Sequence, residues 1–571
     1  MNNFTIHSLD VQLAHFELKT RTVELNLDSF TNPLEQTDEF LVYKNDHVIR
    51  IYDRVCDHNG GRLFAKEGIA RCPLHGWRLN PETGRYLDVN CAKQPLLTVH
   101  QPELDSPLVT VETKDLRRNL WAFDKKYDTQ LEFINHACLL FSIEGVIKFA
   151  TDPWVTGPAF CNGWWLSKAS PHDVFEKLNA CDFIYISHNH PDHLHPESLS
   201  YLRKDMPILT APFPSGSTVR YLKSLGFKNI VTCGFTEQLV CQQRQIALSV
   251  LKSGDFRDDS GLLVQLGEFS ALLTVDSNFL DFGRLPEKVN LLCSSFAGGA
   301  SGFPLCFDLY SEDEKTRIVQ RNKSAILATN RQTIQRCKPD HFMPYAGFFT
   351  EKAPRDQYIK AMNRKNTVDD YQTLCTNLNT GLLNVDKENV FFFSGALLTH
   401  STCRPFQALP QKAVQTYLDK VAAEVSAVQR GEICRYFQHS AFYHPLVLEV
   451  TPCNDEFQPI ADSVAVEFDR HASPQVLTPG TALRQLATEK GKNYLHIKVR
   501  HNELKRVCAT GLPWEDLSIG FQCRINRDPD IYNSDFWFHF TNIYIDDAVT
   551  SLIYRETSQP PYATAYNSSC D

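Results

Sequence analysis

The sequence has no long apolar run, no excess of basic residues and no clustered cysteine framework. No window approaches the roughly 18 consecutive apolar residues of a transmembrane helix, so we expect no membrane span. The 58 basic and 67 acidic residues give a net charge of −9, which argues against general nucleic-acid binding. The first residues have neither a basic start nor a long apolar segment, so no signal peptide is expected.

The 18 cysteines are scattered along the chain instead of following the spacing of a disulfide scaffold. This distribution favours a reducing cytoplasm, in which most thiols stay free and a few bind metal. A chain of 571 residues is too long for one hydrophobic core, so three or four domains are expected. No internal repeat or low-complexity tract divides the chain.

A group of histidines follows the apolar run at 183–187, which is typical of a buried strand. The segment 188–193 reads HNHPDH, and imidazole and carboxylate are ligands that zinc and iron accept. The sequence therefore predicts a metal site formed by His188, His190, Asp192 and His193. A polar surface turn that is rich in histidine is the alternative. The spacing resembles the metal loop of the metallo-β-lactamase fold, in which the first two histidines hold one metal and the aspartate and last histidine a second.

A second pattern places Cys56 beside His58 and Cys72 beside His75 in two short loops. Two thiolates on one iron and two imidazoles on the other form a Rieske 2Fe–2S cluster, with a zinc site as the alternative. The flanking segments 39–43 and 48–52 are β-prone and separated by a polar turn, so an all-β domain is predicted for residues 1–115. Gly61 stands where respiratory Rieske proteins add a cysteine. This indicates the ferredoxin-like type that feeds electrons to an oxygenase.

The remaining chain is predicted to contain two further domains. Residues 116–130 are charged and polar and are expected to be a linker. Strands and helices alternate around the histidine loop, which predicts an αββα, metallo-β-lactamase-like sandwich over 131–400. Residues 401–571 combine an amphipathic helix at 412–430 with strands at 446–450 and 494–499. They form an α+β region without a cluster of metal ligands.

Further metal ligands are expected at later strand ends. Asp276 follows an apolar strand at 272–275 and is predicted to bind metal, with a turn-capping acid as the alternative. The metallo-β-lactamase fold usually supplies a histidine between the loop and this aspartate. Asp255 occupies the expected place and is the candidate replacement, because His195 is too close to the loop. His341 is interpreted as structural. A site rich in carboxylates favours iron over zinc.

Two other features have both a structural and a functional interpretation. The glycine-rich segment 298–302 would present backbone N–H groups to a phosphate or carboxylate, or form a plain tight loop. Trp164 and Trp165 would pack in the core, or stack on a base or sugar.

Several segments are similar to those of the CMP-N-acetylneuraminate hydroxylase family. They lie at 157–160 (GPAF), 163–166 (GWWL), 184–188 (IYISH), 296–304 (FAGGASGFP), 514–517 (WEDL) and 519–532. The resemblance covers most of the chain and includes both metal motifs. It implies a cytosolic monooxygenase that uses dioxygen to hydroxylate the N-acetyl methyl group of a sugar nucleotide, CMP-sialic acid. It also implies a cytochrome b5-type or ferredoxin electron donor and its reductase.

Two other functional classes remain open from the sequence. One is a metal-dependent hydrolase of a phosphodiester or lactone with an accessory Rieske domain, in which the metal lowers the pKa of bound water. The other is an electron-transfer or scaffold protein with an inactive metal loop. Iron content and reductant-dependent oxygen uptake distinguish the oxygenase from both.

Overall fold

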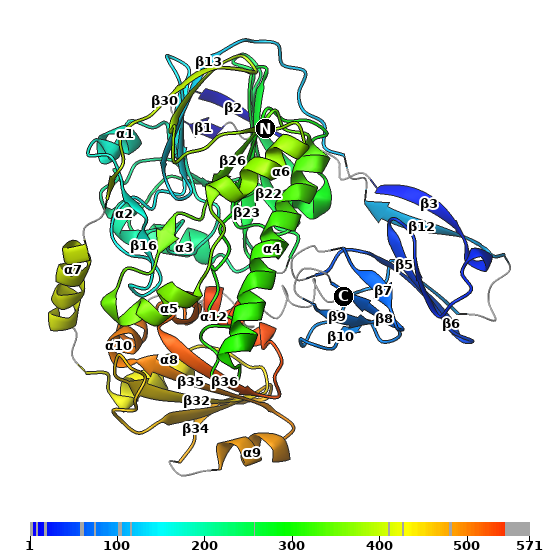
Figure 1. Ribbon diagram of the computed structural model, residues 1–571, viewed down its shortest axis with the longest axis vertical. Helices are drawn as coiled ribbons and strands as arrows, with labels where there is room; N and C mark the ends of the chain where they lie inside the picture. Colours follow the sequence, from blue (N-terminus) through cyan, green and yellow to red (C-terminus); the bar gives the residue numbers. More distant parts are fainter. Residues whose placement is uncertain are drawn as a thin grey trace.

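Two large sheets lie face to face and enclose the main hydrophobic core (Figure 1). The computed structural model describes residues 4–6, 9–15, 20–57, 62–72, 76–100, 106–114, 117–255, 257–408, 411–424, 427–478 and 482–542. In spatial order, the nine-stranded sheet contains β1 (Phe4–Ile6), β2 (Leu9–His15), β21 (Glu237–Cys241), β22 (Ile246–Lys252), β23 (Ser260–Leu266), β24 (Phe269–Leu273), β25 (Leu291–Ser295), β26 (His341–Tyr345) and β28 (Gly381–Leu382). The eight-stranded sheet contains β20 (Ile230–Thr232), β19 (Ile208–Thr210), β18 (Phe183–Tyr185), β15 (Ile147–Thr151), β14 (Cys138–Ile143), β13 (Asp128–Asn135), β29 (Val390–Ser394) and β30 (Leu397–Thr402).

Helices cover the outer faces of both sheets. On the eight-stranded sheet, apolar residues of α1 (Val174–Asn179), α2 (Pro196–Ser200) and α3 (Ser217–Ser224) share one buried cluster with the outer strand residues. The long helix α4 (Glu312–Cys337) packs on the nine-stranded sheet, where the Asn330 side chain donates to a carbonyl at the end of β25. Two sheets between two helical layers form the αββα sandwich that the sequence predicted, so that fold class is confirmed.

The N-terminal part of the chain forms a small all-β unit. Two four-stranded sheets and a two-stranded ribbon build it, from β3 (Thr20–Asn26), β4 (Leu34–Gln36), β5 (Phe40–Lys44), β6 (Val48–Asp53), β7 (Phe64–Lys66), β8 (Ile69–Arg71), β9 (Arg78–Asn80), β10 (Arg85–Tyr86), β11 (Leu97–His100) and β12 (Leu108–Lys114). The two strands expected at 39–43 and 48–52 are β5 and β6, and they pair in antiparallel fashion. The all-β prediction for this region is therefore confirmed.

The edges of this unit differ from the expected boundaries. β1 and β2 pair with β21, so residues 4–15 belong to the central sheet and not to the N-terminal unit. The segment expected to be a linker is also fixed to the central sandwich. The Arg118 guanidinium lies 2.9 Å from the Asp281 carboxylate in a buried ion pair, and the Trp121 indole donates to Gln238. A buried charge is stable only when it is paired, which explains why this polar segment is ordered.

The C-terminal region is an α+β unit, as the sequence predicted. A five-stranded sheet contains β34 (Ala472–Val476), β33 (Val464–Asp469), β32 (Leu446–Cys453), β35 (Asn493–Arg500) and β36 (Cys523–Asp528). The helices of this region are α7 (Gln411–Glu424), α8 (Arg430–Gln438), α9 (Leu483–Glu489), α10 (His501–Thr510), α11 (Glu515–Ile519) and α12 (Ser534–Asn542). Helix α7 stands apart from the sheet, where Tyr417 contacts Trp165 of the central part (Figure 1). The aromatic residues of α12 share a buried cluster with Trp154 and Trp164 of the central part. The two parts therefore have a common core.

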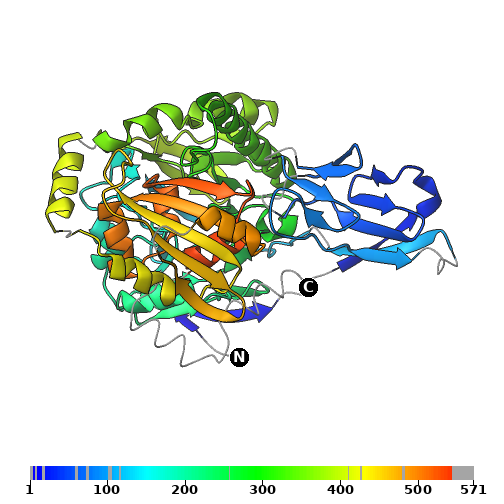
Figure 2. The same ribbon diagram turned by 90° about the horizontal axis from the view of Figure 1, so that it is seen from below.

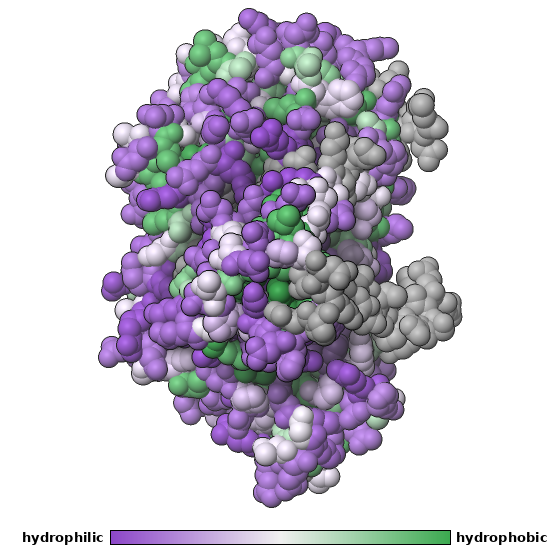
Figure 3. All heavy atoms as spheres, turned by 90° about the vertical axis from the view of Figure 1, so that its right-hand side faces the viewer, coloured by the Kyte–Doolittle hydropathy of each residue, from purple (hydrophilic) through white to green (hydrophobic). Residues whose placement is uncertain are grey.

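The N-terminal β unit projects from one side of the molecule (Figures 1 and 2). Its inner edge meets the C-terminal part at Tyr532, whose backbone N–H donates to the carbonyl of Asp88 at 3.2 Å. The Trp77 and Tyr532 rings lie 6.4 Å apart across this contact. Viewed from the side of this unit, the surface is mostly hydrophilic with small scattered apolar patches (Figure 3). Among the described helices, none is both long and apolar enough to cross a membrane.

Candidate metal centre

The histidine loop leaves the sandwich at the end of β18 and turns back before α2. The backbone N–H of His193 donates to the carbonyl of His190 at 3.0 Å, which closes a tight turn. All the predicted loop ligands are buried, at 8% exposure or less: His188, His190, Asp192 and His193. A polar surface turn would be exposed, so this alternative does not describe the loop.

The predicted ligands converge on one region. His193 Nε2 lies 3.4 Å from Asp192 Oδ2 and 3.5 Å from Asp276 Oδ2. Ligand atoms of His188, His193 and Asp276 lie within 4.8 Å of one another. His190 joins this group because its Nδ1 lies 3.0 Å from His188 Nε2. The loop and the segment after β24 therefore open on the same edge of the sandwich.

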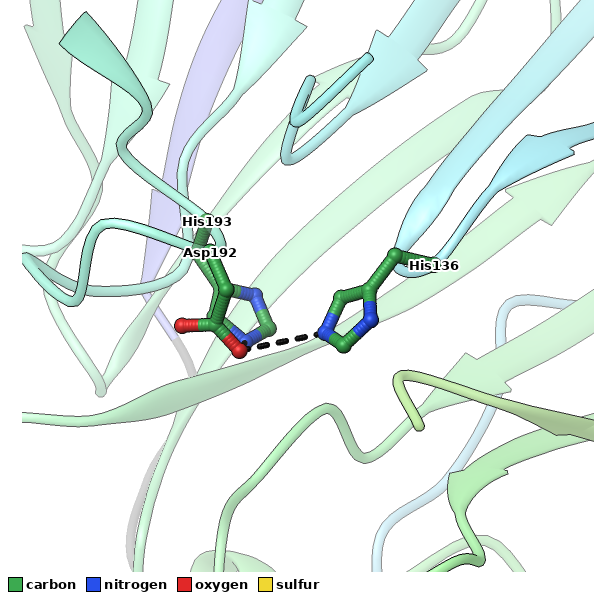
Figure 4. Close-up of side chains that lie close together, drawn as sticks. All are labelled: His136, Asp192 and His193. Carbon is green, nitrogen blue, oxygen red and sulfur yellow. Dashed lines mark hydrogen bonds and ion pairs between the residues drawn. The ribbon is translucent and has the colours of Figure 1, made fainter. Parts of the chain in front are cut away.

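One histidine at this edge was not predicted from the sequence. His136 lies in the turn between β13 and β14, and its Nε2 is 3.1 Å from Asp192 Oδ2 (Figure 4). His136, Asp192 and His193 form a second group whose ligand atoms lie within 4.8 Å of one another. The available signal was a histidine at the end of an apolar strand, 131–135, which is the same signal that identified the loop.

Two buried carboxylates orient the loop histidines. Asp152 Oδ2 lies 3.0 Å from His193 Nδ1, and Asp152 also accepts 2.8 Å hydrogen bonds from the N–H and hydroxyl of Ser187. Asp259 Oδ1 lies 3.4 Å from His188 Nδ1, which is hydrogen-bonded to the Ser187 hydroxyl at 3.0 Å. The Asp152 carboxylate at His193 Nδ1 keeps the proton on that nitrogen and leaves the Nε2 lone pair for a metal. Neither residue was predicted, although Asp152 also follows a strand end.

The pKa values of two histidines of the site are shifted in opposite directions, because burial lowers both and only His193 has carboxylates that outweigh it. Burial disfavours the imidazolium of His193, but the carboxylates of Asp192 and Asp152 outweigh it and hold the His193 pKa well above its usual range. Burial, together with the rings of His193 and His190, lowers the pKa of His188 well below its usual range. Burial also raises the pKa of Asp259 to about 7, against the effect of the nearby Arg257.

Several buried atoms of the site make no hydrogen bond within the described part of the chain. They are His190 Nε2, His193 Nε2, Asp192 Oδ1 and both carboxylate oxygens of Asp259. Buried polar atoms are normally paired, and each unpaired one costs free energy. A cation bound among these imidazoles and carboxylates would satisfy them. The donor set thus fits the iron or zinc that the sequence predicted.

Asp255 is not brought into either group of potential ligands found among the described residues. Its Oδ2 lies 2.9 Å from Arg257 Nε and accepts a 2.7 Å hydrogen bond from Asn278. The Ser253 hydroxyl donates to its Oδ1 at 3.0 Å. The carboxylate is therefore fully engaged by neighbouring donors. Arg257 in turn lies 3.7 Å from Asp259, which is the acid that faces His188.

The C-terminal part also reaches the site, although the sequence indicated no ligand cluster there. Glu515, the first residue of α11, places its Oε2 3.6 Å from His190 Nε2. The Thr541 hydroxyl near the end of α12 donates to the same carboxylate. The Asn189 side chain donates to the Thr541 carbonyl at 2.8 Å. Helices α11 and α12 therefore close over the histidine loop.

The Rieske-type motif is described at its two cysteines. Cys56 and Cys72 are buried in one cluster of the N-terminal unit, which also includes Ala325 of α4. The Tyr86 hydroxyl lies 3.9 Å from Cys56 Sγ. The predicted ligands His58 and His75 lie outside the described residues. The edge that carries the cysteines therefore faces α4 and the chain segment before α12.

Three other features were singled out in the sequence. Trp164 stacks on Phe349 with ring centroids 3.5 Å apart, and Trp165 is also buried, so the pair belongs to the core. In the segment 298–302, the Asn363 side chain donates to the Gly299 carbonyl at 3.0 Å, while Ala300 and Ser301 are exposed. His341 begins β26 level with Ala271, well before Asp276 along the neighbouring strands.

Comparisons with known proteins identify the N-terminal motif and relatives over most of the chain. Residues 19–108 match the Rieske [2Fe-2S] domain family. The cytidine monophosphate-N-acetylneuraminic acid hydroxylase of Danio rerio is 31% identical over 540 residues, which cover 88% of each chain. The Xenopus laevis protein of the same name is 28% identical and covers 93% of this chain and 94% of the relative. The diiron β-hydroxylase CmlA of Streptomyces venezuelae aligns with 47% of this chain and 54% of its own at a TM-score of 0.33 and 20% identity.

Proposed function

Because the chain belongs to the cytidine monophosphate-N-acetylneuraminic acid hydroxylase family, we propose that it is an iron-dependent monooxygenase converting CMP-N-acetylneuraminate to CMP-N-glycolylneuraminate. The observation that carries this proposal is the presence, in one chain, of a Rieske domain and a buried cluster of histidines and aspartates. A hydrolase needs no electrons, whereas an oxygenase needs them one at a time. A Rieske domain beside this cluster therefore favours the oxygenase over the hydrolase.

The proposal gives each metal group its own ligands. Cys56, His58, Cys72 and His75 would hold the 2Fe–2S cluster, and His188, His190, Asp192, His193 and Asp276 would hold the catalytic iron. When bound, the cluster supplies single electrons and the iron activates dioxygen. Asp152 keeps His193 in the tautomer that binds metal. Asp255, proposed from the sequence as a ligand, instead holds Arg257 beside Asp259.

A cavity of about 220 Å³ beside the histidine loop supports a place for the substrate. Its polar wall is formed by Tyr221, Tyr417 and Arg506, and Phe160 lines it with a ring 5.6 Å from that of His190. Typical ligand pockets measure roughly 300–1,000 Å³, so this cavity suits the sugar and not the whole nucleotide. The Arg506 guanidinium would bind the carboxylate or phosphate of the sugar nucleotide. The residues that line this cavity do not include the 298–302 loop.

We further propose the partners and the compartment. Electrons would enter at the N-terminal unit from a cytochrome b5-type or ferredoxin donor and its reductase. Tyr532 contacts this unit at Asp88, and α12, which begins two residues later, contacts the histidine loop through Thr541; these two contacts support an electron route along this segment. A reducing cytoplasm supplies the sugar nucleotide and keeps the scattered cysteines reduced.

The proposal is tested by metal analysis and turnover on the full-length protein. After anaerobic reconstitution, the oxygenase should contain iron beyond that of the cluster. It should consume oxygen only when a reductant and CMP-N-acetylneuraminate are both present. Asp192→Ala should abolish product formation and leave the Rieske electron paramagnetic resonance signal intact, because the cluster has its own ligands. Zinc at the site with oxygen-independent hydrolysis would instead establish the hydrolase.

A further inference from the structure

His136 is held in an unusual position by its surroundings. Its backbone has φ of 44°, in the left-handed region that is strained for a non-glycine residue. The carbonyl of His136 accepts a 2.9 Å hydrogen bond from the N–H of Ala346, which fixes this turn against the loop after β26. The ring packs edge-on against Trp154, with centroids 4.9 Å apart. The imidazole, which is 1% exposed, is therefore directed to one point by rigid neighbours.

That point is the carboxylate of Asp192. His136 Nε2 lies 3.1 Å and His193 Nε2 lies 3.4 Å from the same oxygen, Asp192 Oδ2. The two rings approach from different strands, with centroids 5.7 Å apart and planes at 72° (Figure 4). Two imidazole nitrogens and one carboxylate oxygen thus converge from separate directions. A 2-His-1-carboxylate set of this kind is the ligand arrangement of mononuclear iron oxygenases.

We propose that His136 is a further ligand of the proposed metal centre, where it forms, with Asp192 and His193, a 2-His-1-carboxylate group beside the other loop ligands. The inference deepens the proposed function, because it names a ligand outside the histidine loop for the same catalytic centre. Asp152 supports this geometry from behind, since its contact with His193 Nδ1 turns His193 Nε2 toward Asp192. The neighbouring group of His188, His193 and Asp276 shares His193 with this set.

The competing role for His136 is a hydrogen-bond donor that only orients Asp192. A donor can be replaced by another N–H at the same place, whereas a ligand requires the imidazole lone pair. His136→Gln separates the two roles, because the glutamine amide nitrogen reaches approximately the position of Nε2 and can still donate to Asp192. His136→Ala removes both capacities. His341→Gln is the matched control, because His341 also adjoins a β-strand but lies away from the site.

The experiment counts metal ions on the full-length protein with its Rieske cluster intact. A chelator removes metal from the proposed catalytic site, which is then titrated anaerobically with Co²⁺. Because Co²⁺ is a different element, bound Co²⁺ is counted separately from the iron of the cluster. We expect His136→Gln and His136→Ala both to bind one Co²⁺ fewer than the parent, or to bind it more than about 100-fold more weakly, beyond the 10–100-fold typical of a lost orienting contact. His341→Gln should match the parent.

The inference is overturned if His136→Gln binds Co²⁺ with the stoichiometry and affinity of the parent, whatever His136→Ala does. It is also overturned if both variants bind normally. The Rieske signal and the thermal transition of each variant show that the fold is retained, and the glutamine variant keeps the test decisive if the alanine variant does not fold. The ion count does not depend on turnover. If the protein proved to be a hydrolase, the proposed function would be refuted and the result for His136 would still stand.

Discussion

Asp152→Asn is the substitution that most sharply tests how the histidines of the candidate metal centre are oriented. Asp152 accepts hydrogen bonds from Ser187 N–H and Oγ at 2.8 Å each and faces His193 Nδ1 at 3.0 Å. The introduced amide can still accept from the Ser187 N–H with its oxygen. Its NH₂ group then faces His193 Nδ1, which must become an acceptor. The ring proton moves to Nε2, and Nε2 loses the lone pair that binds metal.

The size of the effect follows from the contact that is lost. A hydrogen bond to a charged group contributes about 1.5–3 kcal/mol. Since about 1.4 kcal/mol is a tenfold change in binding, metal affinity should fall about 10- to 150-fold. The change in volume is small, so the fold should remain intact. Anaerobic titration with Co²⁺ or Fe²⁺ measures the affinity, and thermal unfolding reports the stability.

Asp182→Asn is the matched control for this substitution. Asp182 lies just before β18, at the end of the strand away from the histidine loop, and accepts a 2.7 Å hydrogen bond from the N–H of Lys148. It should leave metal affinity unchanged. If Asp152→Asn also binds metal like the parent while remaining folded, the tautomer argument is wrong.

Three further predictions concern the cluster, the domain seam and the dependence of stability on pH. His75→Cys should lower the reduction potential of the Rieske cluster, because thiolate stabilises ferric iron more than imidazole does; potentiometry checks this, and an unchanged potential excludes His75 as a ligand. Gly163→Ala should lower the melting temperature, with a cost of at least about 1–3 kcal/mol, because a Cβ there would overlap the Gly520 backbone of α11. The control Gly431→Ala, where nothing lies within 4 Å, should not be destabilising. Burial lowers the pKa of His539 to about 3, below its unfolded value of about 6.5. Between these two values the unfolded chain binds the extra proton, so the free energy of unfolding falls as the pH falls, by up to about 1.4 kcal/mol per pH unit. In His539→Gln, unfolding measured from pH 7 to 4 should show a flatter slope than in the parent, and an identical slope would contradict the assignment.

The part of the site that was predicted from the sequence is the part that is local. The loop at 188–193 follows its own strand directly, so spacing alone indicates that its side chains converge. Asp276 was found for the same reason, because it follows an apolar strand. The fold class followed from the alternation of strands and helices around the loop.

The part that was missed depends on which distant segments meet. His136 and Asp152 become important only because β13, β14 and β15 lie beside β18 in the folded sheet. Glu515 reaches His190 only because α11 packs over the loop. Asp255 has the expected spacing, yet Arg257, two residues later, engages its carboxylate. Their positions after strands mark His136 and Asp152 as candidates, but the local sequence does not show which strand ends meet.

The pairing of the first strands is a further long-range event. β2 has an alternating, β-prone sequence that suits either the nine-stranded sheet or a sheet of the N-terminal β unit. Its register with β21, which pairs Gln12 with Val240, joins segments far apart in the chain. Proximity along the chain therefore favoured the wrong neighbour, the N-terminal β unit.

The central claim is that the two metal groups of this chain together insert an oxygen atom into the N-acetyl group of a CMP-linked sugar. The most direct measurement is mass spectrometry of the product formed from CMP-N-acetylneuraminate under ¹⁸O-labelled dioxygen in unlabelled water. We predict CMP-N-glycolylneuraminate carrying one labelled oxygen atom, and no such product from Asp192→Ala. A product whose new oxygen comes from water, or undiminished turnover in Asp192→Ala, would contradict the claim.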